Sequence, residues 1–257
     1  MEVHHHSHTA RKKWTHYLWE FLMLFLAVFC GFLAENKREH IVEGKRAREY
    51  CISLLSDLKV DTFELSGAVR NGKIIIASID TIVSIASNLN GKLEVSGTFY
   101  DHSRKISTLW YVDWRRSTLL QLIESGNLRY IRNKDLVNNI NEYYRLQNIV
   151  TERYQIEREI IAKSVELRSK VLNSAVNVQF NRMQIDLKES NPVAPISSLI
   201  KLNYPLSPHA SEFIHEYINL LIERRRRQIA TAENANAVAL DMAKKLIRLI
   251  SDEYNLK

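Results

Sequence analysis

Proline is confined to one short stretch of this chain, and this limits the folds that the chain can adopt. All four prolines fall between residues 192 and 208, and only seven glycines occur among the 257 residues. An all-β sandwich or barrel needs many short strands joined by turns, and proline and glycine are the residues that make most turns. Hydrophobic residues (46%) and charged residues (25%) are present in the proportions of a globular protein. We therefore expect an all-α fold.

An apolar segment follows a short tail at the N-terminus. Residues 1–16 form a basic, histidine-rich tail, and residues 21–34 contain no charged or strongly polar side chain. As a helix, residues 17–34 would extend about 27 Å, close to the ~30 Å hydrocarbon thickness of a bilayer. The segment is apolar on all sides, whereas a core helix usually has a polar face. We predict a single transmembrane helix over residues 17–34.

Aromatic residues and the lack of a cleavage signal support an uncleaved anchor. Trp14, Tyr17 and Trp19 are typical of the aromatic belt at a membrane interface. A signal peptide cleaved after Ala34 would have bulky Phe32 where a small residue is required. Basic residues flank the segment on both sides, so they do not decide its orientation. We favour an inner-membrane protein whose body lies outside the cytoplasm.

Residues 35–90 form a stalk or a first helical hairpin. Apolar positions recur there with a 4-3 spacing, as in a heptad repeat. Two interpretations follow: a long helix or broken hairpin that packs on the body, with a turn at Arg70–Gly72, or a coiled-coil stalk that dimerises. The positions in this stripe are Cys51, Leu55, Leu58, Thr62, Leu65, Val69, Gly72, Ile76, Ile79, Val83 and Ala86.

Residues 91–257 are expected to form a bundle of long helices. Capping patterns predict a short helix over 118–125, with Ser117 as its N-cap, and a long helix over 134–180. Gly126 and Asn133 act as the structural hinge between these two helices. The proline-containing stretch 183–207 is a crossover, and a final helix extends from about 208 to 254. One anchor followed by about four long helices is the expected architecture.

No pattern in the sequence indicates catalysis. Phosphate loops, dinucleotide fingerprints and nucleophile elbows are absent. His215 and Asn219 stand at metalloprotease spacing, but asparagine replaces the second zinc ligand, so a surface histidine is expected. The carboxylates Asp57 and Asp61 are expected to be solvated. We predict a protein that is not an enzyme, with no cofactor, no metal site and no small-molecule ligand.

Histidines and cysteines offer little support for a metal site. Four closely spaced histidines in the tail could hold a transition metal, although opportunistic binding by a mobile tail is the favoured interpretation. Two cysteines cannot build a disulfide framework or a four-ligand zinc site. These residues are His4, His5, His6 and His8, with Cys30 and Cys51.

Two groups of arginines are candidate interaction residues. Four consecutive arginines project around most of a helix, so they cannot all contact one phosphate backbone. A solvated girdle that pairs with acidic faces or lipid headgroups is therefore favoured over a nucleic-acid site. Two further arginines near the hinge could cap helix carbonyls or contact a partner. The six residues are Arg224, Arg225, Arg226 and Arg227, with Arg129 and Arg132.

Three stretches together resemble an uncharacterised family of bacterial single-pass membrane proteins with a helical domain of unknown function. They are the anchor FLMLFLAVFCGFLAENKREH, the hinge SGNLRYIRNKDL followed by INEYY, and the closing EYINLL and LIRLISDEYNL. The resemblance spans nearly the whole chain and implies a single-pass anchored helical protein. It implies no activity.

The first functional hypothesis is a membrane-anchored, non-enzymatic module that binds a protein partner or itself. The second is a ligand-sensing or enzymatic domain with a pocket between its helices, which would place buried polar side chains together. The third, least favoured, is a membrane-tethered cytoplasmic nucleic-acid binder that uses the four arginines.

Overall fold

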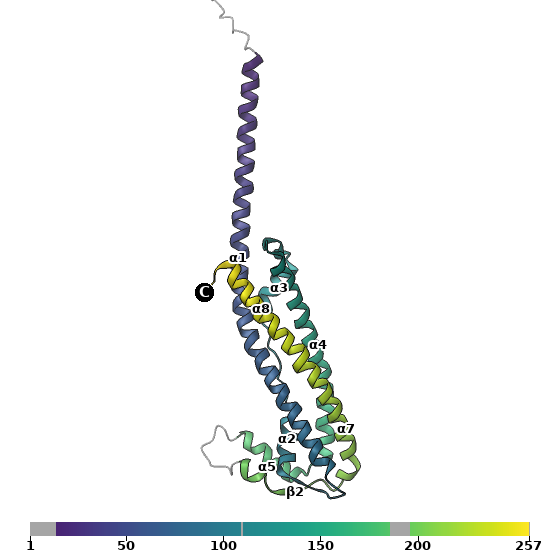
Figure 1. The fold of residues 1–257 in the computed structure, drawn as a ribbon. Coiled ribbons are helices and arrows are strands. Elements are labelled where there is room, and N and C mark those ends of the chain that lie inside the picture. Colours follow the sequence, from purple (N-terminus) through teal and green to yellow (C-terminus); the bar gives the residue numbers. More distant parts are fainter. Residues whose placement is uncertain (1–13, 109, 186–195, 257) are drawn as a thin grey trace, which may run out of the picture.

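The first helix dominates the architecture. The structure is a computed structural model that describes residues 14–108, 110–185 and 196–256. Helix α1 (Trp14–Ser87) has 74 residues and extends about 110 Å without a break. Its apolar stretch, residues 17–34, is exposed along its whole length. By length and composition this stretch is long enough to cross a membrane. Buried residues begin only at Ala47, so nearly half of α1 projects from the rest of the molecule (Figure 1).

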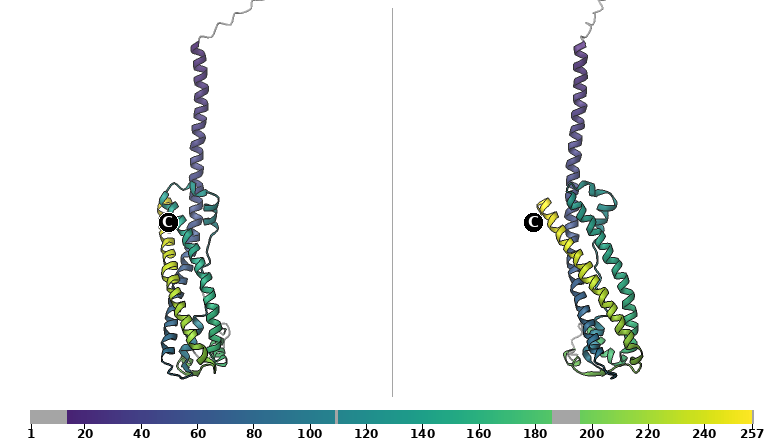
Figure 2. Two further views of the ribbon diagram at one scale, coloured as in Figure 1. Left: turned by 90° about the vertical axis from the view of Figure 1, so that its right-hand side faces the viewer. Right: turned by 45° about the vertical axis from the view of Figure 1, so that its right-hand side comes forward.

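Two further helical rods pack beside the second half of α1. One is α4 (Lys134–Val171), and the other comprises α7 (Ala210–Ile229), the π-helix η3 (Ala230–Asn236) and α8 (Ala237–Tyr254). Both α7 and α8 pack against α1 and α4, as the views of the bundle show (Figure 2). The predicted all-α fold and final helix are therefore confirmed, although a π-helical segment lies within that helix.

Short elements complete the two ends of the bundle. We call the end close to the apolar stretch the near end; it contains α3 (Ser117–Glu124), η1 (Asn127–Tyr130) and the C-terminus (Figure 1). The opposite, far end contains α2 (Gly97–Lys105) and α5 (Ser174–Ile185), and α6 (Ile196–Leu199) follows in the chain. The antiparallel strands β1 (Glu94–Ser96) and β2 (Asn203–Pro205) also lie there and pair Val95 with Tyr204.

The turn suggested at Arg70–Gly72 is wrong, because α1 continues through it. Gly72 instead allows two helices to approach closely: a Cβ atom at this position would lie 2.3 Å from the Cβ of Ala232 in η3. Gly67 has a similar role, since a Cβ there would lie 2.8 Å from the ring of Trp110. Both glycines therefore serve packing rather than a change of direction.

The hinge residues behave largely as predicted. Gly126 adopts the left-handed conformation with φ 68°, which favours glycine. Asn133 caps α4, since its Oδ1 accepts a hydrogen bond from the amide of Leu136 at 3.1 Å. The predicted cap Ser117 is wrong, because it lies inside α3 and Arg116 holds the cap position.

The long helix predicted to end near Phe180 ends earlier, at Val171. Asn173 causes the break, because its Oδ1 accepts hydrogen bonds from the amides of Ala175 (3.0 Å) and Val176 (3.3 Å) and so starts α5.

Replacing Asn133 by alanine should lower the free energy of unfolding by about 1 kcal/mol, the usual effect of losing an N-cap. The variant also loses the hydrogen bond from Asn133 Nδ2 to Glu253 Oε2 at 2.7 Å. Urea unfolding of the full chain in mild detergent, followed by circular dichroism, measures the change. Asn139→Ala is the control, because Asn139 lies within α4 and its side chain donates to the carbonyl of Asp135 in the same helix. Equal losses in both variants would contradict the capping role.

The apolar core consists of two clusters. One lies in the near half, between α1, α4 and α8, and the other in the far half, between α1, α4 and α7. From Cys51 to Ile79 the buried stripe of α1 matches every second predicted position, and the intervening positions lie one residue earlier than predicted. Ala86, the last predicted position, is only partly buried. The buried positions of this stripe are Cys51, Leu54, Leu58, Asp61, Leu65, Ala68, Gly72, Ile75, Ile79 and Ile82.

Candidate functional site

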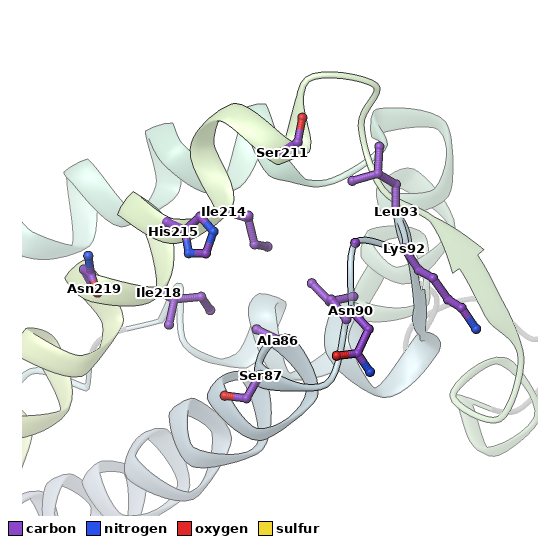
Figure 3. Close-up of a pocket in the computed structure, with 12 residues that line it drawn as sticks. Ala86, Ser87, Asn90, Lys92, Leu93, Ser211, Ile214, His215, Ile218 and Asn219 are labelled. Carbon is purple, nitrogen blue, oxygen red and sulfur yellow. The ribbon is translucent and has the colours of Figure 1, made fainter.

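A cleft of about 430 Å³ lies at the far end of the bundle, between the end of α1, the loop after it and the first turns of α7 (Figure 3). Asn90 (φ 45°) and Gly91 (φ 79°) turn the chain at the end of α1. The amide of Leu206 then donates a hydrogen bond to the carbonyl of Leu93 at 2.8 Å. This contact and the β1–β2 pairing bring the start of α7 beside the end of α1.

The lining of the far-end cleft combines apolar and polar groups. Ile214 and Ile218 of α7 contribute apolar side chains, and Asn90 and Asn219 contribute amides. His215 also faces the cleft and is exposed, so the predicted surface histidine is confirmed. Among the described residues, no carboxylate lines the cleft. Such a surface suits binding, since apolar area provides affinity and a few polar groups orient the bound segment.

Potential metal ligands are scattered in the part of the chain that the structure describes. No group of three histidine, cysteine or acidic residues there is arranged to hold a metal ion. His4, His5, His6 and His8 lie outside the described residues. Cys30 is exposed, and Cys51 is buried, which raises the pKa of its thiol to about 11.

A buried polar layer separates the two apolar clusters at the level of η3. Glu157 of α4 is 1% exposed, and Arg224 of α7 is fully buried. The Arg224 guanidinium donates a hydrogen bond to the carbonyl of Ile106, and Thr231 of η3 donates to Glu157 Oε1 at 3.4 Å. Burial raises the pKa of Glu157 and lowers that of Arg224 to about 10. Helices from different parts of the chain thus bring together charged groups with shifted proton affinities.

A second buried carboxylate, Asp61, lies in the near cluster and is 1% exposed. It accepts hydrogen bonds from the hydroxyl of Tyr143 (2.7 Å), the amide group of Gln147 (3.2 Å) and the backbone amide of Arg115 (2.8 Å). The expectation that Asp61 is solvated is therefore wrong. Burial is the main cause that raises the pKa of Asp61, and these hydrogen bonds lower it in part.

The raised pKa of Asp61 predicts a pH-dependent difference between wild type and Asp61→Asn. The folded state holds the Asp61 proton more tightly than the unfolded state, so this group's stabilising contribution is present at low pH. This contribution is lost as the pH rises from the pKa of Asp61 in the unfolded chain, about 4, through its higher pKa in the folded state. An asparagine side chain carries no charge, so we expect Asp61→Asn to gain stability relative to wild type as the pH rises. Denaturant unfolding between about pH 3 and pH 8 tests this, and parallel curves would contradict it.

The four consecutive arginines have different environments. Arg224 is buried, whereas Arg225 pairs with Asp80 of α1. Arg226 and Arg227 both pair with Glu223, at 2.8 and 2.7 Å, and hold the pKa of that carboxyl at about 2. The prediction that the arginines pair with the acidic face of a neighbouring helix holds for Arg225. Arg226 and Arg227 pair within α7, and Arg224 belongs to the core.

The other predicted interaction residues lie at the near end of the bundle or in the first turns of α1. Arg129 is exposed, lies over the ring of Tyr130 at 5.1 Å and donates a hydrogen bond to its hydroxyl. Arg132 is also exposed. Trp14, Tyr17 and Trp19 are exposed along the first turns of α1 (78%, 56% and 63%). Sequence reasoning missed the far-end cleft, which depends on segments that lie far apart in the chain.

Comparisons with known proteins add no family or fold to this description: no protein-family model, no curated protein and no solved structure matches the chain.

Proposed function

We propose that this protein is a membrane-anchored helical module that binds a protein partner at the far end of its bundle. The observation that carries the proposal is the continuity of α1, which connects the apolar stretch directly to the far-end cleft. The part of α1 between Ala34 and Ser87 corresponds to about 80 Å of helix. One rigid element would thus hold the cleft far from the membrane surface.

The apolar stretch of α1 is proposed as a single transmembrane anchor in a bacterial inner membrane, with the bundle outside the cytoplasm. No described part of the chain covers this stretch, and an exposed apolar surface of this size is unfavourable in water. Trp14, Tyr17 and Trp19 would lie at one membrane interface. The resemblance to an uncharacterised single-pass family supports the same arrangement.

Binding without catalysis is proposed as the role of the cleft. Its lining combines apolar area and amides with Lys92 and His215, and among the described residues no carboxylate lies there to act beside the histidine. A nucleic-acid role for the four arginines is not favoured, since Arg225, Arg226 and Arg227 already contact carboxylates. Self-association is the second form that this binding could take, with another copy of the chain as partner.

Site-specific photo-cross-linking in cells tests the proposal. A photoreactive residue at His215 or Asn219 should yield a cross-linked product with another polypeptide. The same residue at Glu216 is the control, because Glu216 is also exposed on α7 but does not line the cleft. The same yield at all three positions, or none, would contradict the proposed cleft.

The anchor and its orientation need a separate measurement. Alkaline phosphatase and a fluorescent protein are fused, in separate strains, after Lys257. Active phosphatase with a dark fluorescent fusion is expected for a bundle outside the cytoplasm. The reverse result would overturn the orientation, and soluble fusions of both kinds would overturn the anchor.

The buried polar layer favours a second candidate function, a sensor whose state depends on ligand or proton binding. Glu157 and Arg224 interact electrostatically beside η3, and π-helical segments are frequent at functional sites. Glu157→Gln should then change the cross-linking yield at His215 without unfolding the bundle. An unchanged yield would leave the layer with a structural role only.

A further inference from the structure

A shallow, open groove lies between α1 and α8, halfway along the bundle. Its volume is about 520 Å³. Val69, Ile74 and Ala77 of α1 line it together with Leu240 of α8, which lies beside α1 in the bundle (Figure 1). The lining from residue 66 to residue 77 extends about 17 Å along α1, or about three helical turns. This length fits a short helix laid into the groove.

Large apolar side chains in and beside the groove are exposed. Ile74 is 48% exposed, although it lies in the middle of the bundle, and Phe63, about three turns earlier on α1, is 69% exposed. Exposed apolar groups gathered along one face commonly mark an interaction site. The transmembrane proposal does not account for them, because they lie far beyond the apolar stretch.

The charge at the groove has one sign. Arg70 and Lys73 line it, and no carboxylate of the described chain does. Within the described ranges neither residue forms an ion pair, whereas the nearby Arg225, Arg226 and Arg227 each do. The groove therefore offers uncompensated positive charge beside an apolar surface. Its electrostatic complement is an apolar stripe flanked by carboxylates.

We propose that this groove binds an amphipathic helix of a partner protein, with its apolar stripe against Ile74 and its Asp or Glu residues toward Arg70 and Lys73. The inference rests on the proposed protein-binding role and assigns it a second surface. A second copy of this chain is a poor occupant. Two copies anchored in one membrane would meet at the same height and bring Arg70 and Lys73 against their own counterparts.

Photo-cross-linking of the full chain in cells identifies the occupant. A photoreactive residue at Ile74 or Phe63 should give a product, and mass spectrometry should map it to a segment with apolar residues at helical spacing and flanking carboxylates. Ile52, 40% exposed on the same helix but outside the groove, is the matched control. A product with a second copy, with lipid or with a basic segment would overturn the proposal, as would no product at Ile74.

Charge reversal provides an independent test with a defined probe. Two amidated helical peptides of about 20 residues, one of Leu and Glu and one of Leu and Lys, are titrated onto the full chain in nanodiscs. The Glu peptide should bind about tenfold more tightly than the Lys peptide. Arg70→Glu with Lys73→Glu should abolish this preference. The control, Lys59→Glu with Lys163→Glu, makes the same charge change at exposed positions outside the groove. This control should preserve the preference for the Glu peptide.

Equal binding of the two peptides, or loss of the preference in both double variants, would overturn the proposal.

The cross-linking experiments distinguish the groove from the far-end cleft. Products at Ile74 without products at His215 would keep the groove and overturn the far-end cleft. The reverse pattern would keep the cleft and overturn the groove.

Discussion

Replacing Gly72 by leucine should lower the free energy of unfolding by about 3 kcal/mol, the upper range for overpacking a core. Even the Cβ atom would lie 2.3 Å from the Cβ of Ala232 and 3.1 Å from the amide nitrogen of Gln228. The Gln228 side chain can rotate away, but the Cβ of Ala232 is fixed to the continuous α7–η3–α8 rod and cannot move without shifting that rod. Urea unfolding of the full chain in mild detergent, followed by tryptophan fluorescence, measures the loss.

Gly44→Leu is the matched control on the same helix. Nothing lies within 4 Å of the Cβ position at Gly44, and leucine has the higher helix propensity. We expect this variant to unfold at the same urea concentration as wild type or a higher one. A similar loss in both variants would show that glycine matters for the helix itself, and would contradict close packing at Gly72.

Replacing Asp61 by alanine should also lower the free energy of unfolding by about 3 kcal/mol, because buried donors lose their acceptor. The hydroxyl of Tyr143 and the backbone amide of Arg115 would then lose the hydrogen bonds that they donate in an apolar cluster. Removal of a buried charge offsets this loss only in part. The same urea experiment at pH 7 measures it.

Asp61→Asn should retain the stability that Asp61→Ala loses. Its carbonyl oxygen can accept from Arg115, and its amide can donate to Gln147 Oε1, which has no partner among the described residues. Asp57→Ala, one turn earlier on α1, is the second control and should have little effect, because Asp57 is only half-buried. Equal losses for alanine and asparagine at position 61 would contradict the hydrogen-bonding role.

The position of the buried polar layer matters for how the two ends of the molecule could communicate. Glu157 and Arg224 lie between two apolar clusters, beside Thr231 of η3. A π-helix contains wider turns than an α-helix and is frequent at functional sites. In the proposed sensor, a movement of α7 at the far-end cleft would reach this layer before it reaches the near half.

Local signals in the sequence predicted several elements well. The αL glycine Gly126 and the cap Asn133 mark the boundaries where the structure has them. Such signals act within a few residues, so they do not depend on the rest of the fold. The end of α4 was missed, because Asn173 offers its side chain to α5 in a stretch whose apolar periodicity continues to Phe180.

The all-α class, the apolar stretch and the final helix could be predicted without a structure, because a shortage of turn residues and apolar periodicity are local properties. Which face of α1 is buried could not be predicted from the sequence. Ile75 is buried and Ile76 is only partly so, although both are equally apolar. The difference depends on where α4, α7 and α8 lie, as does the burial of Asp61 and Arg224. Long-range packing supplies the partners that make these buried polar positions tolerable, and no local pattern contains that information.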